Sequence, residues 1–84
     1  PPVLYPNPST HSVHVRTAMA MHPGFDLEII PVTSGQSISY DPTLLRRMPD
    51  ELVVDVSSLA PGTYLFRLRA PGVEPVAVKV AVRR

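Results

Sequence analysis

Few side chains in this sequence combine the types and spacing that metal binding requires. Three histidines, His11, His14 and His22, could in principle gather a metal ion. No paired Asp, Glu or Cys stands at ligand spacing beside them, and the chain contains no cysteine. Placement in exposed loops and strands is the simpler interpretation. We therefore expect no metal site and no cofactor.

Serine and carboxylate side chains offer equally little for catalysis. Ser57-Ser58 lies in no G-x-S-x-G turn, and no order of Ser, His and Asp indicates a nucleophile. We expect this pair to form a turn or a one-turn cap before Leu59. Asp50, Glu51 and Asp55 could pair as acid and base, but on a solvated strand edge they would only carry charge. We therefore expect no enzyme activity.

Charge and hydropathy exclude two further classes of partner. Arg67 and Arg69 alternate outward on one predicted strand and could grip a phosphate or a carboxylate, although solubilising a sheet face is the simpler role. A net charge of only +1 argues against many phosphate contacts, so we expect no nucleic-acid partner. No apolar run approaches the roughly 18 residues of a membrane span, so we expect no transmembrane segment.

The elements that would position these side chains are marked most clearly between Leu59 and Leu68. Pro61 presets the first corner of a turn, and Gly62 supplies the left-handed conformation of the second. Beyond this turn a strand alternates, with Tyr64 leading its apolar face. A turn that leads into a tyrosine-headed strand is typical of a β-sandwich chain crossing between its sheets.

Eleven prolines divide the 84 residues into short segments, so helices of ordinary length have no room. We expect strands at 3–5, 12–17, 25–30, 52–56, 63–69 and 76–82, with 36–40 as a short hairpin partner. Residues 44–48 lie between Pro42 and Pro49, too short for more than one helical turn. The spacing predicts an all-β antiparallel sandwich of about seven short strands.

The last predicted strand, 76–82, alternates most regularly and carries four valines on one face. Burying them is worth about 6–10 kcal/mol before entropy, so this strand must dock, with 63–69 as its expected partner. A chain of 84 residues forms one small domain. Pro1-Pro2 is typical of a linker end, so we assign 1–2 to a linker remnant and 3–84 to the domain.

Three motifs, taken in order, resemble a known family. Tyr5-Pro6-Asn7-Pro8 looks like the Y-P-N-P opening motif of the type A C-terminal sorting domains of the Bacteroidetes type IX (Por) secretion system. Residues 55–68, DVSSLAPGTYLFRL, resemble the family's D-h-S-x-L-x-x-G-x-Y-h-h-r-h block, and 78–84, VKVAVRR, resemble its closing basic strand. The resemblance extends from Val3 onward. Segments 22–24 and 42–49 depart from it by their proline content.

The resemblance implies a non-catalytic Ig-like β-sandwich fused behind an N-terminal cargo domain. The type IX translocon and its shuttle proteins would recognise this domain. The cargo would cross the periplasm and then either stay on the outer-membrane surface or be secreted. In most members a surface sortase then removes the domain and the cargo is joined to anionic lipopolysaccharide, whereas a few components of the attachment machinery retain it.

The resemblance also indicates which residues matter. We expect the recognition signal in the terminal run Lys79, Val80, Ala81, Val82, Arg83 and Arg84. The structural motif residues would be Tyr5, Pro6, Asn7, Pro8, Pro61, Gly62 and Tyr64. The alternative is an Ig-like or fibronectin-like module that binds a partner protein or a glycan, including a retained domain of a surface-attachment component. Exposed aromatic side chains for a glycan would be limited to Tyr5 and Tyr40.

Overall fold

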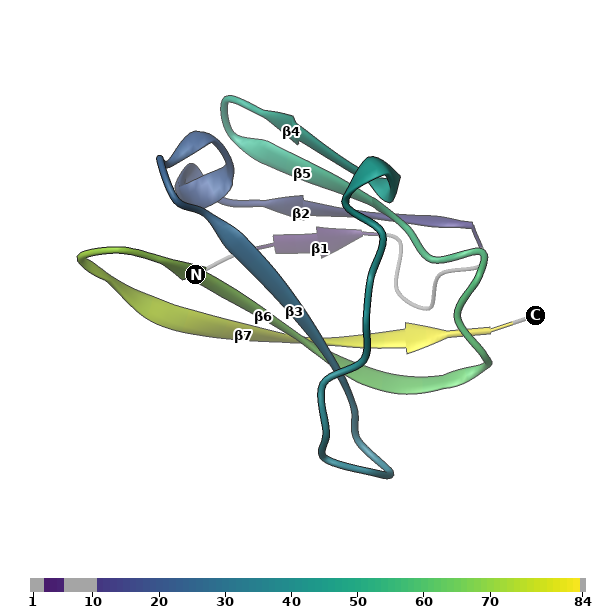
Figure 1. Ribbon diagram of the computed structural model, residues 1–84. Helices are drawn as coiled ribbons and strands as arrows, with labels where there is room; N and C mark the ends of the chain where they lie inside the picture. The colour runs from purple at the N-terminus through teal and green to yellow at the C-terminus, as the bar shows by residue number, and fades with distance from the viewer. Residues whose placement is uncertain (1–2, 6–10, 84) are drawn as a thin grey trace.

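The computed structural model describes residues 3–5 and 11–83. Within these ranges the chain forms two antiparallel sheets (Figure 1). The strands are β1 (Val3–Tyr5), β2 (Ser12–Arg16), β3 (Asp26–Pro31), β4 (Leu45–Met48), β5 (Glu51–Asp55), β6 (Gly62–Ala70) and β7 (Val73–Val82). Two 3-10 helices, η1 (Ala18–Met21) and η2 (Pro42–Leu44), lie between strands. The predicted all-β sandwich of about seven short strands is confirmed, and the two-sheet arrangement agrees with an Ig-like fold.

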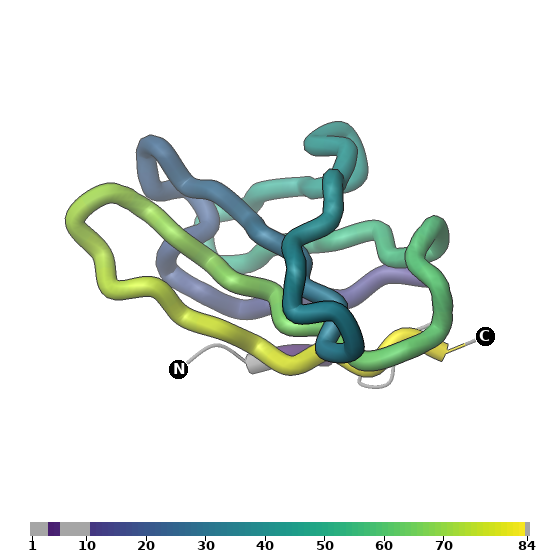
Figure 2. The backbone as a smooth tube through the Cα atoms, turned by 60° about the horizontal axis from the view of Figure 1, so that its bottom comes forward, coloured from purple at the N-terminus to yellow at the C-terminus, as the bar shows by residue number. Residues whose placement is uncertain are grey.

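The strands are ordered β1-β2-β5-β4 in one sheet and β3-β6-β7 in the other. The pairs β1–β2, β4–β5 and β6–β7 are neighbours in sequence and in a sheet, whereas the segments 17–25, 32–41 and 56–61 cross between sheets. The crossing from β3 to β4 appears as the long teal excursion in Figure 2. Among the described strands, β3 and β7 are therefore the edges of the smaller sheet.

The two sheets enclose one apolar core, built by alternation along the strands. In β2 and β5 every second side chain is buried, which turns Val13, Val15, Leu52 and Val54 towards the opposite sheet. Phe66, 0% exposed in the middle of β6, belongs to the same buried cluster. Strands of five to ten residues thus suffice to build the core, because each one contributes a full apolar face.

Strand β6 carries the tyrosine that the sequence predicted as an anchor. Tyr64 is buried, and its hydroxyl donates to the carbonyl oxygen of Ala60, which lies before the strand. Gly62 has the predicted positive φ, 157°, which L side chains rarely adopt. Its predicted place at the corner of a turn is wrong, because it already pairs with Val82 as the first residue of β6. The tight turn lies earlier, where the Leu59 N–H donates to the Val56 carbonyl at 3.0 Å.

The segment 44–48, predicted to hold at most one helical turn, forms strand β4 from Leu45 to Met48. The helical turn precedes them as η2, capped by the Asp41 carboxylate, which accepts from the Thr43 N–H at 2.9 Å. Leu45 to Met48 then pairs residue by residue with β5. Both prolines lie outside the strand, so the ladder to β5 loses no donor.

The hairpin partner expected at 36–40 is reduced to a single bridge. The Ile38 N–H donates to the Ile29 carbonyl at 2.9 Å, and no further pairing of this segment with β3 is found in the described chain. Continuing the ladder would require a donor at Pro31, which has no N–H. The segment therefore leaves β3 as a loop.

Arg47 on β4 fixes the crossing from β2 to β3. Its Nε donates to the carbonyl of Ala20 at 2.6 Å, and its Nη2 donates to the carbonyl of His22 at 2.9 Å. The guanidinium also lies over the Phe25 ring, 5.3 Å from the ring centroid. One cation thus satisfies two loop carbonyls and holds this proline-containing segment against the larger sheet.

The turn between β6 and β7 packs against the same crossing. Gly24 has φ 76°, and a Cβ built on it would lie 2.9 Å from Cγ and Cδ of Pro71. A glycine is needed here for its conformation and for the close approach of the two loops.

Candidate recognition surface

Strand β7, which contains most of the predicted recognition run, is paired with β6 without interruption from Val76 to Val82. It pairs with β6 from Val73 to Val82, confirming the predicted partner. Its valines face the interior: Val80 and Val82 are 0% and 2% exposed. Lys79 points outward and is exposed. Among its described residues, the run therefore combines buried valines that fix the strand with residues that face outward.

The outer face of the smaller sheet carries paired charges. Arg69 Nη2 donates to Asp26 Oδ2 at 2.5 Å, and Arg67 Nη1 lies 3.8 Å from Glu28 Oε1. The hydrogen bond to Asp26 raises the pKa of Arg69. The two arginines that could have gripped a phosphate are thus engaged by carboxylates. For Lys79, by contrast, no carboxylate within the described ranges comes within 4.0 Å of its amine.

The remaining predicted motif residues lie elsewhere. Tyr5 is on β1, in the opposite sheet from β7, so the structure does not bring it to the terminal run. Arg83 follows β7 and is exposed. Pro61 lies at an exposed bend just before β6. Pro6, Asn7, Pro8 and Arg84 fall outside the described residues.

A cluster that the sequence did not predict joins three strands of the larger sheet. The Tyr5 hydroxyl donates to Glu51, whose second oxygen lies 3.3 Å from His14 Nδ1, and the Tyr5 and His14 rings stack at 4.9 Å. The hydrogen bonds from Tyr5 and then from His14 lower the pKa of Glu51. Only the pairing of Tyr5 with His14 across β1 and β2 could have revealed this cluster. It ties β1, the first strand, to the sheet.

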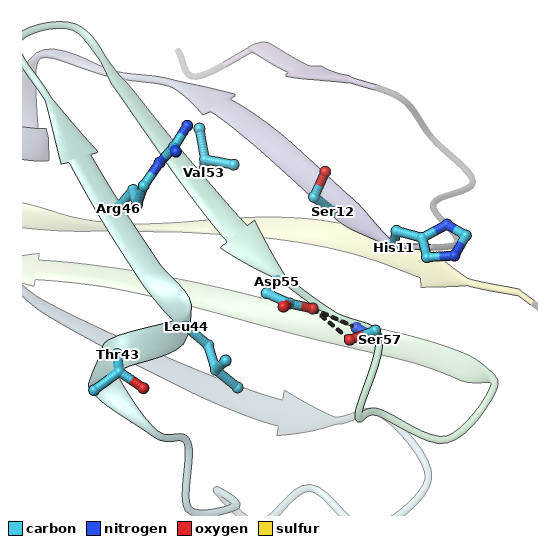
Figure 3. Close-up of a pocket in the computed structure, with 8 residues that line it drawn as sticks. All are labelled: His11, Ser12, Thr43, Leu44, Arg46, Val53, Asp55 and Ser57. Carbon is cyan, nitrogen blue, oxygen red and sulfur yellow. Dashed lines mark hydrogen bonds between the residues drawn. The ribbon is translucent and has the colours of Figure 1, made fainter.

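The larger sheet also carries a shallow cleft of about 400 Å³ near η2 (Figure 3). Its lining residues are His11, Ser12, Thr43, Leu44, Arg46, Val53, Asp55 and Ser57. The Asp55 carboxylate accepts from the Ser57 hydroxyl at 2.6 Å and from its N–H at 2.9 Å, which lowers the pKa of Asp55. The predicted turn role of Ser57 is confirmed, and this carboxylate is held as a turn cap.

Neither a metal centre nor a membrane helix is found in residues 3–5 and 11–83. No three of their His, Asp or Glu side chains gather closely enough to hold a metal ion. No helix among them has the length and hydropathy to cross a membrane.

Comparison with known proteins gives one result. The family model described as "Secretion system C-terminal sorting domain" matches residues 3–82, which is nearly the whole chain. No curated protein and no solved structure matches the chain.

Proposed function

The chain belongs to the family of type IX secretion system C-terminal sorting domains. We propose that it is a non-catalytic sorting signal that directs an attached N-terminal cargo protein across the outer membrane. The observation that supports this most is the family match over residues 3–82, together with a sandwich whose last strand is paired with β6. Export by this route ends at the cell surface or outside the cell, after transit through the periplasm.

We place the recognition signal in the terminal run, residues 79–84. Lys79 supports this placement because it is exposed on an edge strand and has no carboxylate partner in the described chain. Val80 and Val82 would act indirectly, since they are buried and hold the strand in place. Gly62 and Tyr64, on the neighbouring strand, would support the signal and not be contacted themselves.

The partners follow from the family. The translocon and its shuttle proteins would bind the folded domain. A surface sortase would then act on the cargo, which would be joined to anionic lipopolysaccharide.

A reporter protein fused before the chain tests the position of the signal. In a bacterium with a type IX system, we expect the complete fusion at the surface and a fusion lacking residues 79–84 in the periplasm. Because that deletion also removes buried valines, Lys79→Ala provides a folded variant. Arg46→Ala, at an exposed residue of β4, provides a matched loss of one cation. Surface delivery should fall for Lys79→Ala only. Normal delivery of both the deletion and Lys79→Ala would contradict the placement.

The alternative, a module that binds a glycan or a partner protein, has the cleft near η2 as its support. That cleft combines His11 and Arg46 with apolar atoms of Leu44 and Val53. The two functions separate in the reporter assay, since a binding module would not carry a reporter out of the periplasm.

A further inference from the structure

The outer edge of β7 is not covered by another strand of the described chain. The smaller sheet has the order β3-β6-β7, and among the described strands β7 pairs with β6 alone. Figure 1 shows β7 at the limit of this sheet, with β6 between it and β3. An uncovered edge presents backbone N–H and C=O groups that can pair with an incoming strand.

The hydrogen bonds on the far side of β6 show which residues of β7 present these groups. The N–H of Val32 donates to the Thr63 carbonyl at 3.0 Å, so the polar groups of Thr63 point towards β3. In an antiparallel sheet, both backbone groups of a residue point to one side, and the side alternates along the strand. Ala81 lies opposite Thr63 and therefore points its groups away from β6. Lys79 and Ala77, two and four residues earlier, point their backbone groups to the same side, away from β6.

The usable part of this edge is bounded at both ends. Pro75 has no N–H to offer, and the register of β7 against β6 shifts between Leu68 and Ala70 in the same region. At the other end, Ala81 already makes an interaction of its own. Ala77 and Lys79 remain, with one donor and one acceptor each.

Side chains beside this edge indicate what would lie against it. Val76 and Val78 face the interior but stay half-buried, whereas Val80 on the same face is fully buried. A strand added beside β7 would cover the two half-buried valines with its own inward-facing side chains. On the outer face, Lys79 is exposed, and no carboxylate of the described chain lies within 4.0 Å of its amine, so an acidic side chain opposite it would be favoured.

We propose that an extended segment of a protein partner adds to β7 as a further strand, paired with Ala77 and Lys79. Its inward residues are apolar and cover Val76 and Val78, and an outward acidic residue lies beside Lys79. This mode of binding rests on the proposed function, since the partner belongs to the secretion machinery. Backbone pairing supplies affinity and the flanking side chains supply specificity, as in other cases of strand addition.

Proline substitution tests this directly. Ala77→Pro removes one outward N–H and no hydrogen bond to β6, whereas Val78→Pro removes a bond to β6 and is the matched control. Ala77→Pro should unfold close to the temperature of the unchanged chain, and Val78→Pro well below it. In the reporter fusion, Ala77→Pro should reduce the surface fraction by about tenfold, as expected for loss of about one well-made interaction.

Two results would overturn the proposal while leaving the sorting function intact. One is a folded Ala77→Pro fusion that reaches the surface normally while the fusion lacking residues 79–84 does not. The other is a concentration-dependent dimer of the unchanged chain in sedimentation that Ala77→Pro abolishes without loss of delivery, which would make a second copy the occupant. Should the proline ring itself prevent folding, Lys79→Glu takes its place in the reporter fusion, because it keeps every backbone group and sets a like charge against the acidic residue of the partner; surface delivery should fall, and normal delivery of the folded Lys79→Glu fusion would overturn the proposal.

Discussion

Replacing Tyr64 with phenylalanine isolates the hydrogen bond that anchors β6. Tyr64 is 6% exposed, and its hydroxyl donates to the Ala60 carbonyl, so Tyr64→Phe keeps the packed ring and removes only the bond. The net contribution of such a bond is about 0.5–1.5 kcal/mol. Ala60 is exposed, so water can donate a hydrogen bond to its carbonyl in the variant. The larger penalty for a buried acceptor that has lost its partner therefore does not apply. We expect a loss of about 1 kcal/mol in unfolding free energy.

Thermal or urea unfolding of the purified chain measures this loss. For a domain of this size, 1 kcal/mol corresponds to a fall in Tm of about 4–8 °C. Tyr5→Phe is the matched control, because that tyrosine is 42% exposed and water can replace the bond from its hydroxyl to Glu51, so its effect should be smaller. Equal effects of Tyr64→Phe and Tyr5→Phe would refute the idea that Tyr64 anchors the crossing between the sheets.

Three further outcomes are expected from the geometry. Gly24→Ala should cost at least about 1 kcal/mol of strain from its positive φ, and more than Gly35→Ala, because only at Gly24 would the new Cβ meet Pro71 at 2.9 Å; comparative urea unfolding measures the difference. Arg47→Lys should cost about 1–2 kcal/mol in the same assay, the contribution of one hydrogen bond, since one ammonium cannot donate to both loop carbonyls in the geometry of the guanidinium fork. Because the pKa of Asp55 is lower in the folded chain, its ionised carboxylate stabilises the fold above the usual Asp pKa, and this stabilisation is lost as the pH falls through the folded pKa. The free energy of unfolding should therefore decline below about pH 4, and it should decline less steeply in Asp55→Asn.

Alternation was enough to predict the strands that build the core. The apolar residues of 63–69 and 76–82 recur at every second position, and both segments form long paired strands with these side chains inward. Tyr64 was equally predictable, because a turn followed by a tyrosine-headed strand carries its own geometric signal. Its hydroxyl acceptor, four residues earlier, lies within the same local segment.

Local signals failed where a distant partner decides the outcome. Residues 45–48 form a strand because β5 pairs with them. The flanking prolines limit the length of a helix but do not indicate a pairing partner. At 36–40 the reverse occurred, since Pro31 on another strand withholds the donor that a hairpin would need. The cluster of Tyr5, His14 and Glu51 depends on the register of three strands, which no single segment encodes.

The paired arginines show the same limit for the candidate site. Sequence alone could not decide whether Arg67 and Arg69 were free to bind an anion, because their carboxylate partners come from β3, some forty residues away. Lys79 gains its importance in the same way. Its place on an edge strand of the described sheet follows from the strand order and not from its neighbours in sequence.

The most direct measurement of the sorting function is the location of a reporter fused before the complete chain, in cells with and without a working type IX translocon. Protease accessibility and fractionation of whole cells separate surface from periplasmic reporter. We expect the fusion at the surface or in the medium only when the translocon works, and the reporter alone in the periplasm in both strains. A fusion that stays in the periplasm of cells with a working translocon, although folded, would contradict the assignment of this chain as a sorting signal.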